Sequence, residues 1–282
     1  MAERATPQAQ GAARLDAGSA RSAHAVAPRA LAIVAKYPHP GAVKTRLAAT
    51  IGPSEAATLY RAFLEDLSRR FTRAARREDY ALVWAQAPGP GDLREVVGTS
   101  ASLLPQRGDQ FAERLYHVCA DLGAMGFRRV VVISSDSPHV PSTWVRAAFD
   151  ALDQRDVVLG PAEDGGYYLV GVRADCEPPD LFRGIQMSTS RVCAETLCRA
   201  RALGLEVALL PTTFDVDEAP DLTRLLRAVQ RPRHGVAAAA PRTLAALRRL
   251  RLRHPIASCM RAERDLLGII QAAPRAPGRA TR

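Results

Sequence analysis

Apolar residues recur along the chain with two alternating periods, and this alternation predicts strands and helices in turn. Short runs of apolar residues, many of them β-branched, are typical of buried strands, and longer stretches with apolar positions three or four apart are typical of helices. The predicted strands are residues 31–35, 80–84, 130–133, 156–159, 167–170 and 206–210. The predicted helices are a segment capped by Ser54 that runs to Phe71, residues 109–125, a helix after Pro141, a helix capped by Ser188 or Thr189 that runs to about Leu203, and residues 220–229.

Strands separated by helices predict βαβ crossovers. The expected fold is therefore a three-layer α/β/α, Rossmann-like arrangement with a mostly parallel sheet covered on both faces. In such sheets, ligands bind at the carboxyl ends of the strands. The segments that follow predicted strands, and that can therefore meet at this edge, are residues 36–46, Asp136, the turn 161–166 and residues 215–217.

Composition and charge narrow the class of protein. Of the 282 residues, 47% are hydrophobic and 24% are charged, close to the average for a globular protein. No apolar run approaches the roughly 20 residues of a membrane-spanning helix. The net charge of +10 lies at the ends: residues 231–282 hold 12 arginines against two acids, whereas residues 30–230 hold 23 basic and 25 acidic residues. We therefore expect no nucleic-acid partner for the central part.

The same shifts in composition predict the domain organisation. Residues 1–29 are rich in alanine and arginine but lack the apolar stretch of a secretory signal, so we interpret them as a disordered leader. Residues 30–230 form the predicted domain. Residues 231–282 are interpreted as an appendage, a basic tail that is partly helical or disordered. The five cysteines form no C-x-x-C pair, which indicates neither a zinc site nor a disulfide framework, and we expect a cytoplasmic protein.

The loop after the first predicted strand is rich in cations. Only two of the 39 basic residues are lysines, and both, Lys36 and Lys44, lie in this loop together with Gly41 and Arg46. Ammonium and guanidinium groups, with backbone N–H donors, are groups that bind a polyphosphate. The loop matches neither the P-loop nor the Rossmann glycine pattern. It is a candidate phosphate-binding loop, and the alternative is a surface turn with solvated charges.

Aspartates follow two later strands. Asp136 ends the strand 130–133 after two serines, where a carboxylate can ligate Mg²⁺ or Mn²⁺. Asp215 and Asp217 alternate along a strand end, so only one of them points to a given face. That one could complete the metal site while the other caps a helix. For Asp136 too, capping of the next helix is the alternative interpretation.

The turn before the strand 167–170 places two acids ahead of paired glycines. Gly165 and Gly166 allow the backbone to approach a ligand closely, and Asp164 could accept a hydrogen bond from a substrate hydroxyl. The same dipeptide, Asp-Gly, is also typical of a plain hairpin turn.

Six stretches of the chain, in order over about residues 30–230, resemble one family. The chain is similar to bacterial GT-A-type transferases of the radical-SAM/selenodomain-associated transferase family, within the nucleotide-diphosphosugar transferase superfamily. The matching stretches are residues 36–47, 106–115, 134–138, 160–169, 181–189 and 215–222.

This resemblance implies a GT-A fold and a role for each candidate residue. Lys44 and Arg46, in the loop with Lys36 and Gly41, would face the nucleotide phosphates. Asp136 would bind the divalent metal together with Asp215 or Asp217. The turn residues Asp164, Gly165 and Gly166, followed by Tyr167, would face the acceptor or sugar, with Asp136 and Asp164 as the catalytic carboxylates.

Three functions follow from these residues. The first is a metal-dependent glycosyltransferase that uses a nucleotide-activated donor and a small-molecule acceptor. The second is a nucleotidyltransferase that condenses a nucleoside triphosphate with a phosphorylated acceptor and releases pyrophosphate. Both reactions need cations and a metal against the phosphate charge. The third is a nucleotide-binding module without catalysis, which the intact set of Lys44, Arg46, Asp136 and Asp217 disfavours.

Overall fold

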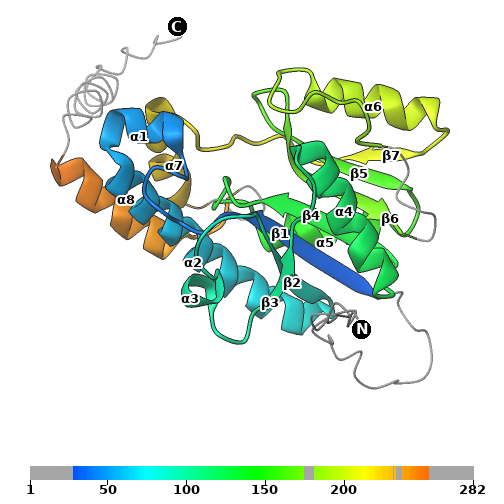
Figure 1. Cartoon of the computed structure of the whole chain (residues 1–282), viewed down its shortest axis with the longest axis horizontal. Coiled ribbons are helices and arrows are strands. Elements are labelled where there is room, and N and C mark those ends of the chain that lie inside the picture. Colours follow the sequence, from blue (N-terminus) through cyan, green and yellow to red (C-terminus); the bar gives the residue numbers. More distant parts are fainter. Residues whose placement is uncertain (1–27, 175–180, 231, 233–236, 254–282) are drawn as a thin grey trace, which may run out of the picture.

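The computed structural model describes residues 28–174, 181–230, 232 and 237–253. Its centre is a seven-stranded sheet with the order β3-β2-β1-β4-β6-β5-β7 (Figure 1). The strands are β1 (Arg29–Ala35), β2 (Ala81–Gln86), β3 (Ser102–Pro105), β4 (Arg129–Ser134), β5 (Val157–Pro161), β6 (Tyr167–Arg173) and β7 (Val207–Leu209). The helices are α1 (Thr45–Ile51), α2 (Pro53–Glu78), α3 (Arg94–Val97), α4 (Phe111–Ala124), α5 (Ser142–Ala151), α6 (Val192–Ala202), α7 (Ala219–Gln230) and α8 (Pro241–Arg253).

Helices cover both faces of the sheet, and side chains of β1 alternate between them. Leu31 and Ile33 belong to the larger core cluster, which includes apolar residues of α1, α2, α5, α7 and α8. Ala30 and Ala32 belong to the second cluster, under α4 and α6. A strand whose successive side chains are buried on opposite faces lies in the middle layer of three. The predicted three-layer α/β/α arrangement is thus confirmed.

The sheet is mostly parallel, and β6 is the exception. It runs antiparallel to both β4 and β5. The turn between β5 and β6 spans residues 162–166, which is too short for the crossover that a parallel neighbour would need. This turn carries the Asp-Gly-Gly sequence, so the hairpin interpretation of its geometry is correct.

Some predicted element boundaries are wrong. Ser54 does not cap α2, because Gly52 holds the N-cap position and Pro53 begins the helix, where a fixed φ and a missing N–H are tolerated. Arg191, rather than Ser188 or Thr189, precedes α6. The elements α1, α3 and β3 were not predicted: they are only 7, 4 and 4 residues long, too short to show a period.

Helix α8 packs against α2, and its side chains Leu247 and Leu250 lie in the larger core cluster. The buried carboxylate of Asp66 on α2 accepts hydrogen bonds from the backbone N–H groups of Arg242 (3.1 Å) and Thr243 (2.8 Å), which caps the start of α8. Residues 241–253 are thus helical, as the partly helical tail predicts, and this helix packs against α2. The predicted domain boundaries stay predictions, and residues 1–27 and 254–282 lie outside the described part.

Within that part, no helix is long and apolar enough to cross a membrane.

Candidate functional site

The loop between β1 and α1 places its three cations at the carboxyl edge of the sheet. Lys36 follows the last residue of β1, and Arg46 lies in the first turn of α1. Between them, Lys44 is the residue that precedes α1, and its backbone is left-handed, with φ 49° and ψ 46°. This conformation is uncommon for a residue with a Cβ, and such strained residues cluster at functional sites. All three cations line one pocket, which we call the main pocket.

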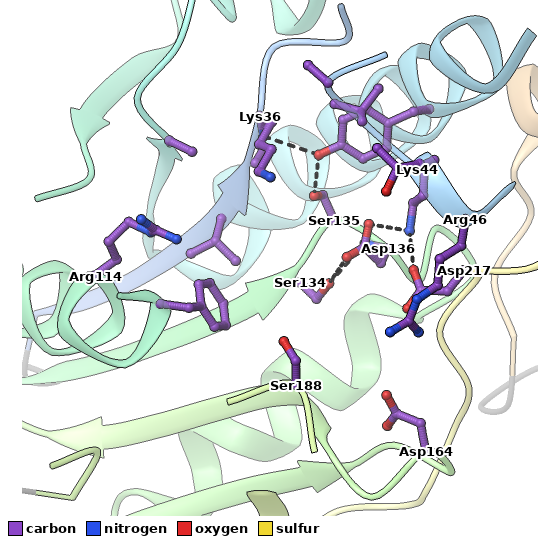
Figure 2. A pocket seen from close by; sticks show the side chains of 18 of the residues that line it. Lys36, Lys44, Arg46, Arg114, Ser134, Ser135, Asp136, Asp164, Ser188 and Asp217 are labelled. Atoms are coloured by element: carbon purple, nitrogen blue, oxygen red, sulfur yellow. Dashed lines mark hydrogen bonds and ion pairs between the residues drawn. The ribbon is translucent and has the colours of Figure 1, made fainter. Parts of the chain in front are cut away.

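The ammonium of Lys44 bridges two aspartates (Figure 2). Its Nζ lies 2.5 Å from Oδ1 of Asp136, which follows β4, and 2.9 Å from Oδ1 of Asp217, which precedes α7. The Lys44 side chain is only 4% exposed, whereas those of Asp136 and Asp217 are 39% and 43% exposed. The first loop and the carboxylates therefore meet at one edge of the sheet, as the rule for strand ends predicts.

These carboxylates determine the charge state of the lysine. Burial by itself lowers the pKa of the Lys44 ammonium, but the negative charges and hydrogen bonds of Asp136 and Asp217 outweigh it. The net result is a pKa for Lys44 above its usual value. Lys44 is therefore a permanent positive charge in the pocket at neutral pH.

A second set of contacts holds Asp136 in position. Ser134 Oγ lies 3.2 Å from Oδ2 of Asp136 and accepts the backbone N–H of Asp136 at 3.0 Å. The backbone N–H of Val216 donates to the carbonyl of Asp136 at 3.1 Å, which ties the segment before α7 to the end of β4. These bonds fix the carboxylate relative to Lys44.

Tyr60 links the first loop to the end of β4, and the sequence did not single it out. Its buried hydroxyl lies 2.7 Å from Ser135 Oγ and accepts the backbone N–H of Lys36 at 3.2 Å. Burial and the nearby charge of Asp136 raise the pKa of Tyr60 to about 12, so the hydroxyl keeps its proton. Tyr60 occupies an apolar position of α2, where the helical pattern indicates only a core residue.

The main pocket has a volume of about 570 Å³, within the range of small-molecule sites. Besides the residues of the first loop, it is lined by Arg114, which lies inside α4, where the helical pattern gave no sign of a ligand contact. Figure 2 shows Arg114 on the side of the pocket opposite Lys44, and Ser188 and Asp164 in the lower part of the view. Ser188 has φ 64°; in the described part, it and Lys44 are two of the three non-glycine residues with positive φ.

A smaller pocket of about 200 Å³, the side pocket, adjoins the main pocket. Both are lined by Asp136, Asp164 and Ser188. Gly166, Tyr167 and Asp215 line only the side pocket. The structure thus divides the candidate residues between two connected spaces, which the sequence did not distinguish.

Two candidate glycines line neither pocket. Gly41 has φ 80° and open space where a Cβ would project. The positive φ, rather than a lack of space, is therefore what favours a glycine at this position. A Cβ on Gly165 would lie 2.0 Å from the carbonyl oxygen of Ser190, so this glycine permits close packing of two loops. Direct ligand contacts by Gly41 and Gly165 stay predictions.

The three proposed metal ligands are not gathered into one set. Asp215 hydrogen-bonds Ser137 Oγ, and burial together with the charge of Asp136 raises the pKa of Asp215 to about 7. In the described part, no three His, Cys, Asp or Glu side chains are grouped to hold a metal ion. Asp136 and Asp217 offer carboxylate oxygens of the type that Mg²⁺ and Mn²⁺ prefer. An ion between them would have to replace the Lys44 ammonium, so their role as ligands stays a prediction.

Comparison with known proteins places these features in a family. Residues 66–189 match the family model described as "Uncharacterized protein conserved in bacteria (DUF2064)". A solved structure from Desulfovibrio desulfuricans G20, provisionally assigned as a nucleotide-diphospho-sugar transferase, is 34% identical, with a TM-score of 0.71 over 79% of this chain and 95% of that one.

Two relatives of established name are more distant. Phosphoenolpyruvate guanylyltransferase of Chloroflexus aggregans is 28% identical, over 67% of this chain and 93% of that protein. The 2-phospho-L-lactate guanylyltransferase of Methanothermobacter thermautotrophicus is also 28% identical, over 68% of this chain and 81% of that protein. Both are nucleotidyltransferases by name. The comparisons therefore favour nucleotidyl transfer, the second function predicted from the sequence, over glycosyl transfer.

Proposed function

This chain belongs to the same family as the Desulfovibrio protein, and because two further relatives are guanylyltransferases by name, we propose that it is a nucleotidyltransferase. It condenses a nucleoside triphosphate with a small phosphorylated acceptor and releases pyrophosphate. GTP is the first nucleotide to test, because the two named relatives are guanylyltransferases. The association with radical-SAM proteins and selenodomains, which the sequence resemblance implied, stays a prediction.

The observation that carries this proposal is the meeting of Lys44 with Asp136 and Asp217 in a pocket that also contains Lys36, Arg46 and Arg114. Four cations around one pocket neutralise the charge of a triphosphate, and a guanidinium can hold two phosphate oxygens at once. No such concentration of positive charge is needed for an uncharged ligand. The main pocket is therefore the proposed site of the phosphate chain.

In the proposed reaction, a phosphate oxygen of the acceptor attacks the α-phosphorus of the nucleotide. The bond from that phosphorus to the oxygen bridging to the β-phosphate breaks, and pyrophosphate leaves with the electron pair. Lys44, Arg46 and Arg114 bind the phosphate oxygens, hold the two reactants in line, and stabilise the charge that develops on the leaving group. A divalent ion on Asp136 and Asp217, when bound, supplies further positive charge against the phosphates.

The test is a product assay on the full chain. The protein is incubated with Mg²⁺ or Mn²⁺, a panel of phosphorylated acceptors, and either each nucleoside triphosphate or each nucleotide-sugar. Pyrophosphate and nucleoside diphosphate are then measured. We expect pyrophosphate only when both a triphosphate and an acceptor are present. Release of a nucleoside diphosphate from a nucleotide-sugar, without pyrophosphate in any mixture, would contradict the proposal.

Glycosyl transfer is the second candidate, and one observation favours it. The side pocket joins the main pocket at Asp136 and offers carboxylates and hydroxyl groups that can bind a sugar. A nucleotide-sugar would then place its pyrophosphate among the cations and its sugar in the side pocket. The product assay separates the two functions, because glycosyl transfer releases the nucleoside diphosphate.

A further inference from the structure

The side pocket differs from the main pocket in charge. Its lining includes the three carboxylates of Asp136, Asp164 and Asp215, and no lysine or arginine of the described part. Lys44 compensates Asp136, but the lysine itself lines only the main pocket. The side pocket therefore presents carboxylate oxygens to anything that enters it, and in the described part no lysine or arginine in its wall offsets them.

Two of these carboxylates, Asp164 and Asp215, have hydrogen bonds but no ion pair with a residue of the described part. Asp164 is exposed and accepts the backbone N–H of Gly166 at 2.9 Å, and Asp215 accepts the hydroxyl of Ser137. Each has a second oxygen available as an acceptor. A carboxylate on a ligand would be repelled here, whereas a hydroxyl would donate to these oxygens. A site that binds substrate hydroxyls discriminates strongly against molecules that lack them.

The remaining walls and the size of the pocket limit the group that fits. Phe111, Met187 and Tyr168 supply apolar surface. The volume of about 200 Å³ is below the range of sites that take a whole drug-sized ligand. It suits one small ring or a short chain, with apolar faces for its carbons and acceptors for its hydroxyls.

We infer that the side pocket takes an uncharged, hydroxyl-bearing group about the size of one sugar ring, so that the acceptor of this chain is a sugar phosphate or polyol phosphate. The names of the two guanylyltransferase relatives specify phosphorylated carboxylic acids, which this pocket disfavours. The inference rests on the proposed function only for the position of the acceptor phosphate in the main pocket.

Calorimetry tests the inference without turnover. The full chain with Mg²⁺ is titrated with inorganic phosphate, phosphoenolpyruvate, 2-phospholactate, and a panel of hexose, pentose and polyol phosphates. At least one sugar or polyol phosphate should bind ten-fold or more tightly than inorganic phosphate, and the two carboxylic acids no more tightly than inorganic phosphate. Tighter binding of either acid than of every sugar and polyol phosphate overturns the inference. So does a panel in which no member exceeds inorganic phosphate.

Two substitutions in the wall of the side pocket test whether this pocket determines the ranking of the ligands. Asp164→Asn keeps the size of the side chain and an oxygen for the N–H of Gly166, and it should reduce the advantage of the sugar phosphate about ten-fold. Met187→Lys adds a cation to the wall and should raise the affinity for phosphoenolpyruvate about ten-fold. Met187→Leu is the matched control and should keep the wild-type ranking. If neither Asp164→Asn nor Met187→Lys changes the ranking, the side pocket does not bind this group.

The calorimetry and the product assay can refute the inference and the proposed function independently of each other. A wild-type ranking that favours sugar phosphates, with no pyrophosphate formed in any mixture, refutes nucleotidyl transfer and leaves the side pocket as inferred. Pyrophosphate formed with phosphoenolpyruvate as readily as with sugar phosphates supports the proposed function and refutes the inference.

Discussion

The main and side pockets share Asp136, Asp164 and Ser188 but differ in charge. The main pocket adds Lys36, Lys44, Arg46 and Arg114, whereas the side pocket adds Asp215, Tyr167 and Met187. We propose the first for phosphate charge and the second for a neutral, hydroxylated group, with Asp136 lying between them where a reacting phosphate would be. If this division is correct, substitutions in the side pocket should change the acceptor without changing the affinity for the phosphate chain.

The largest effect is expected for Lys44→Ala. This change removes the cation that bridges Asp136 and Asp217, and leaves two carboxylates facing the incoming phosphates. We expect kcat/KM for pyrophosphate release to fall by at least about 100-fold, the scale of losing one preorganised charge-stabilising donor. Lys44→Arg is the control and should retain more activity. Equal activity of Lys44→Ala and the wild type would remove the lysine from the phosphate site.

The pH dependence of stability tests whether Asp215, which lines the side pocket, is buried as the structure shows. With its pKa raised to about 7, folded Asp215 binds more protons than the unfolded chain between about pH 4 and pH 7. Stability therefore declines as the pH rises through this window. Asp215→Asn cannot ionise, so its free energy of unfolding relative to wild type should be higher at pH 8 than at pH 5, by about 2 kcal/mol. Denaturant unfolding in EDTA measures this, and the same difference at both pH values would contradict it.

A smaller effect is expected for Arg114→Ala, because this residue lies on the side of the pocket away from the aspartates (Figure 2). The affinity for a nucleoside triphosphate should fall about ten-fold, the scale of losing one charge-assisted hydrogen bond at about 1.5 kcal/mol. Val118→Ala, one turn later on α4 and outside both pockets, is a control for disturbance of the helix and should change the affinity less. A larger loss in the control than in Arg114→Ala would assign the effect to packing.

The smallest effect concerns a site outside both pockets. Asp66→Ala removes the side chain that caps α8 and should lower the free energy of unfolding by about 1 kcal/mol. Because no described residue of α8 lines either pocket, the affinity for a nucleotide should stay unchanged. Loss of affinity, measured by calorimetry at a temperature where the variant is folded, would show that α8 supports the site.

The sequence predicted the parts of the site that depend on strand order. Lys44 and Asp136 lie 92 positions apart, yet both follow strands that turn out to be neighbours, so their meeting follows from the topology. Arg114 and Tyr60 were missed because they lie inside helices, where a helical period indicates a buried or exposed face but no contact. The left-handed backbone of Ser188 was not predicted either, since that conformation depends on the loop around it.

Other differences arise from packing that no local pattern encodes. The basic arginines of residues 241–253 suggested an appendage, but Leu247 and Leu250 on one face of the helix are enough to bury it against α2. Likewise, three aspartates after strands suggested one metal site. The side chain of Lys44 takes the position between two of them, and Ser137 binds the third.

The central claim, that the main pocket binds a phosphate chain through Lys44, has a direct test because Lys36 and Lys44 are the only lysines of the chain. Protein with ¹⁵N-labelled lysine side chains gives two ammonium signals, which Lys36→Arg and Lys44→Arg assign. Addition of GTP with Mg²⁺ should shift the Lys44 signal, and guanosine, which has no phosphates, should leave it in place. A Lys44 signal that no nucleoside triphosphate shifts would contradict the account.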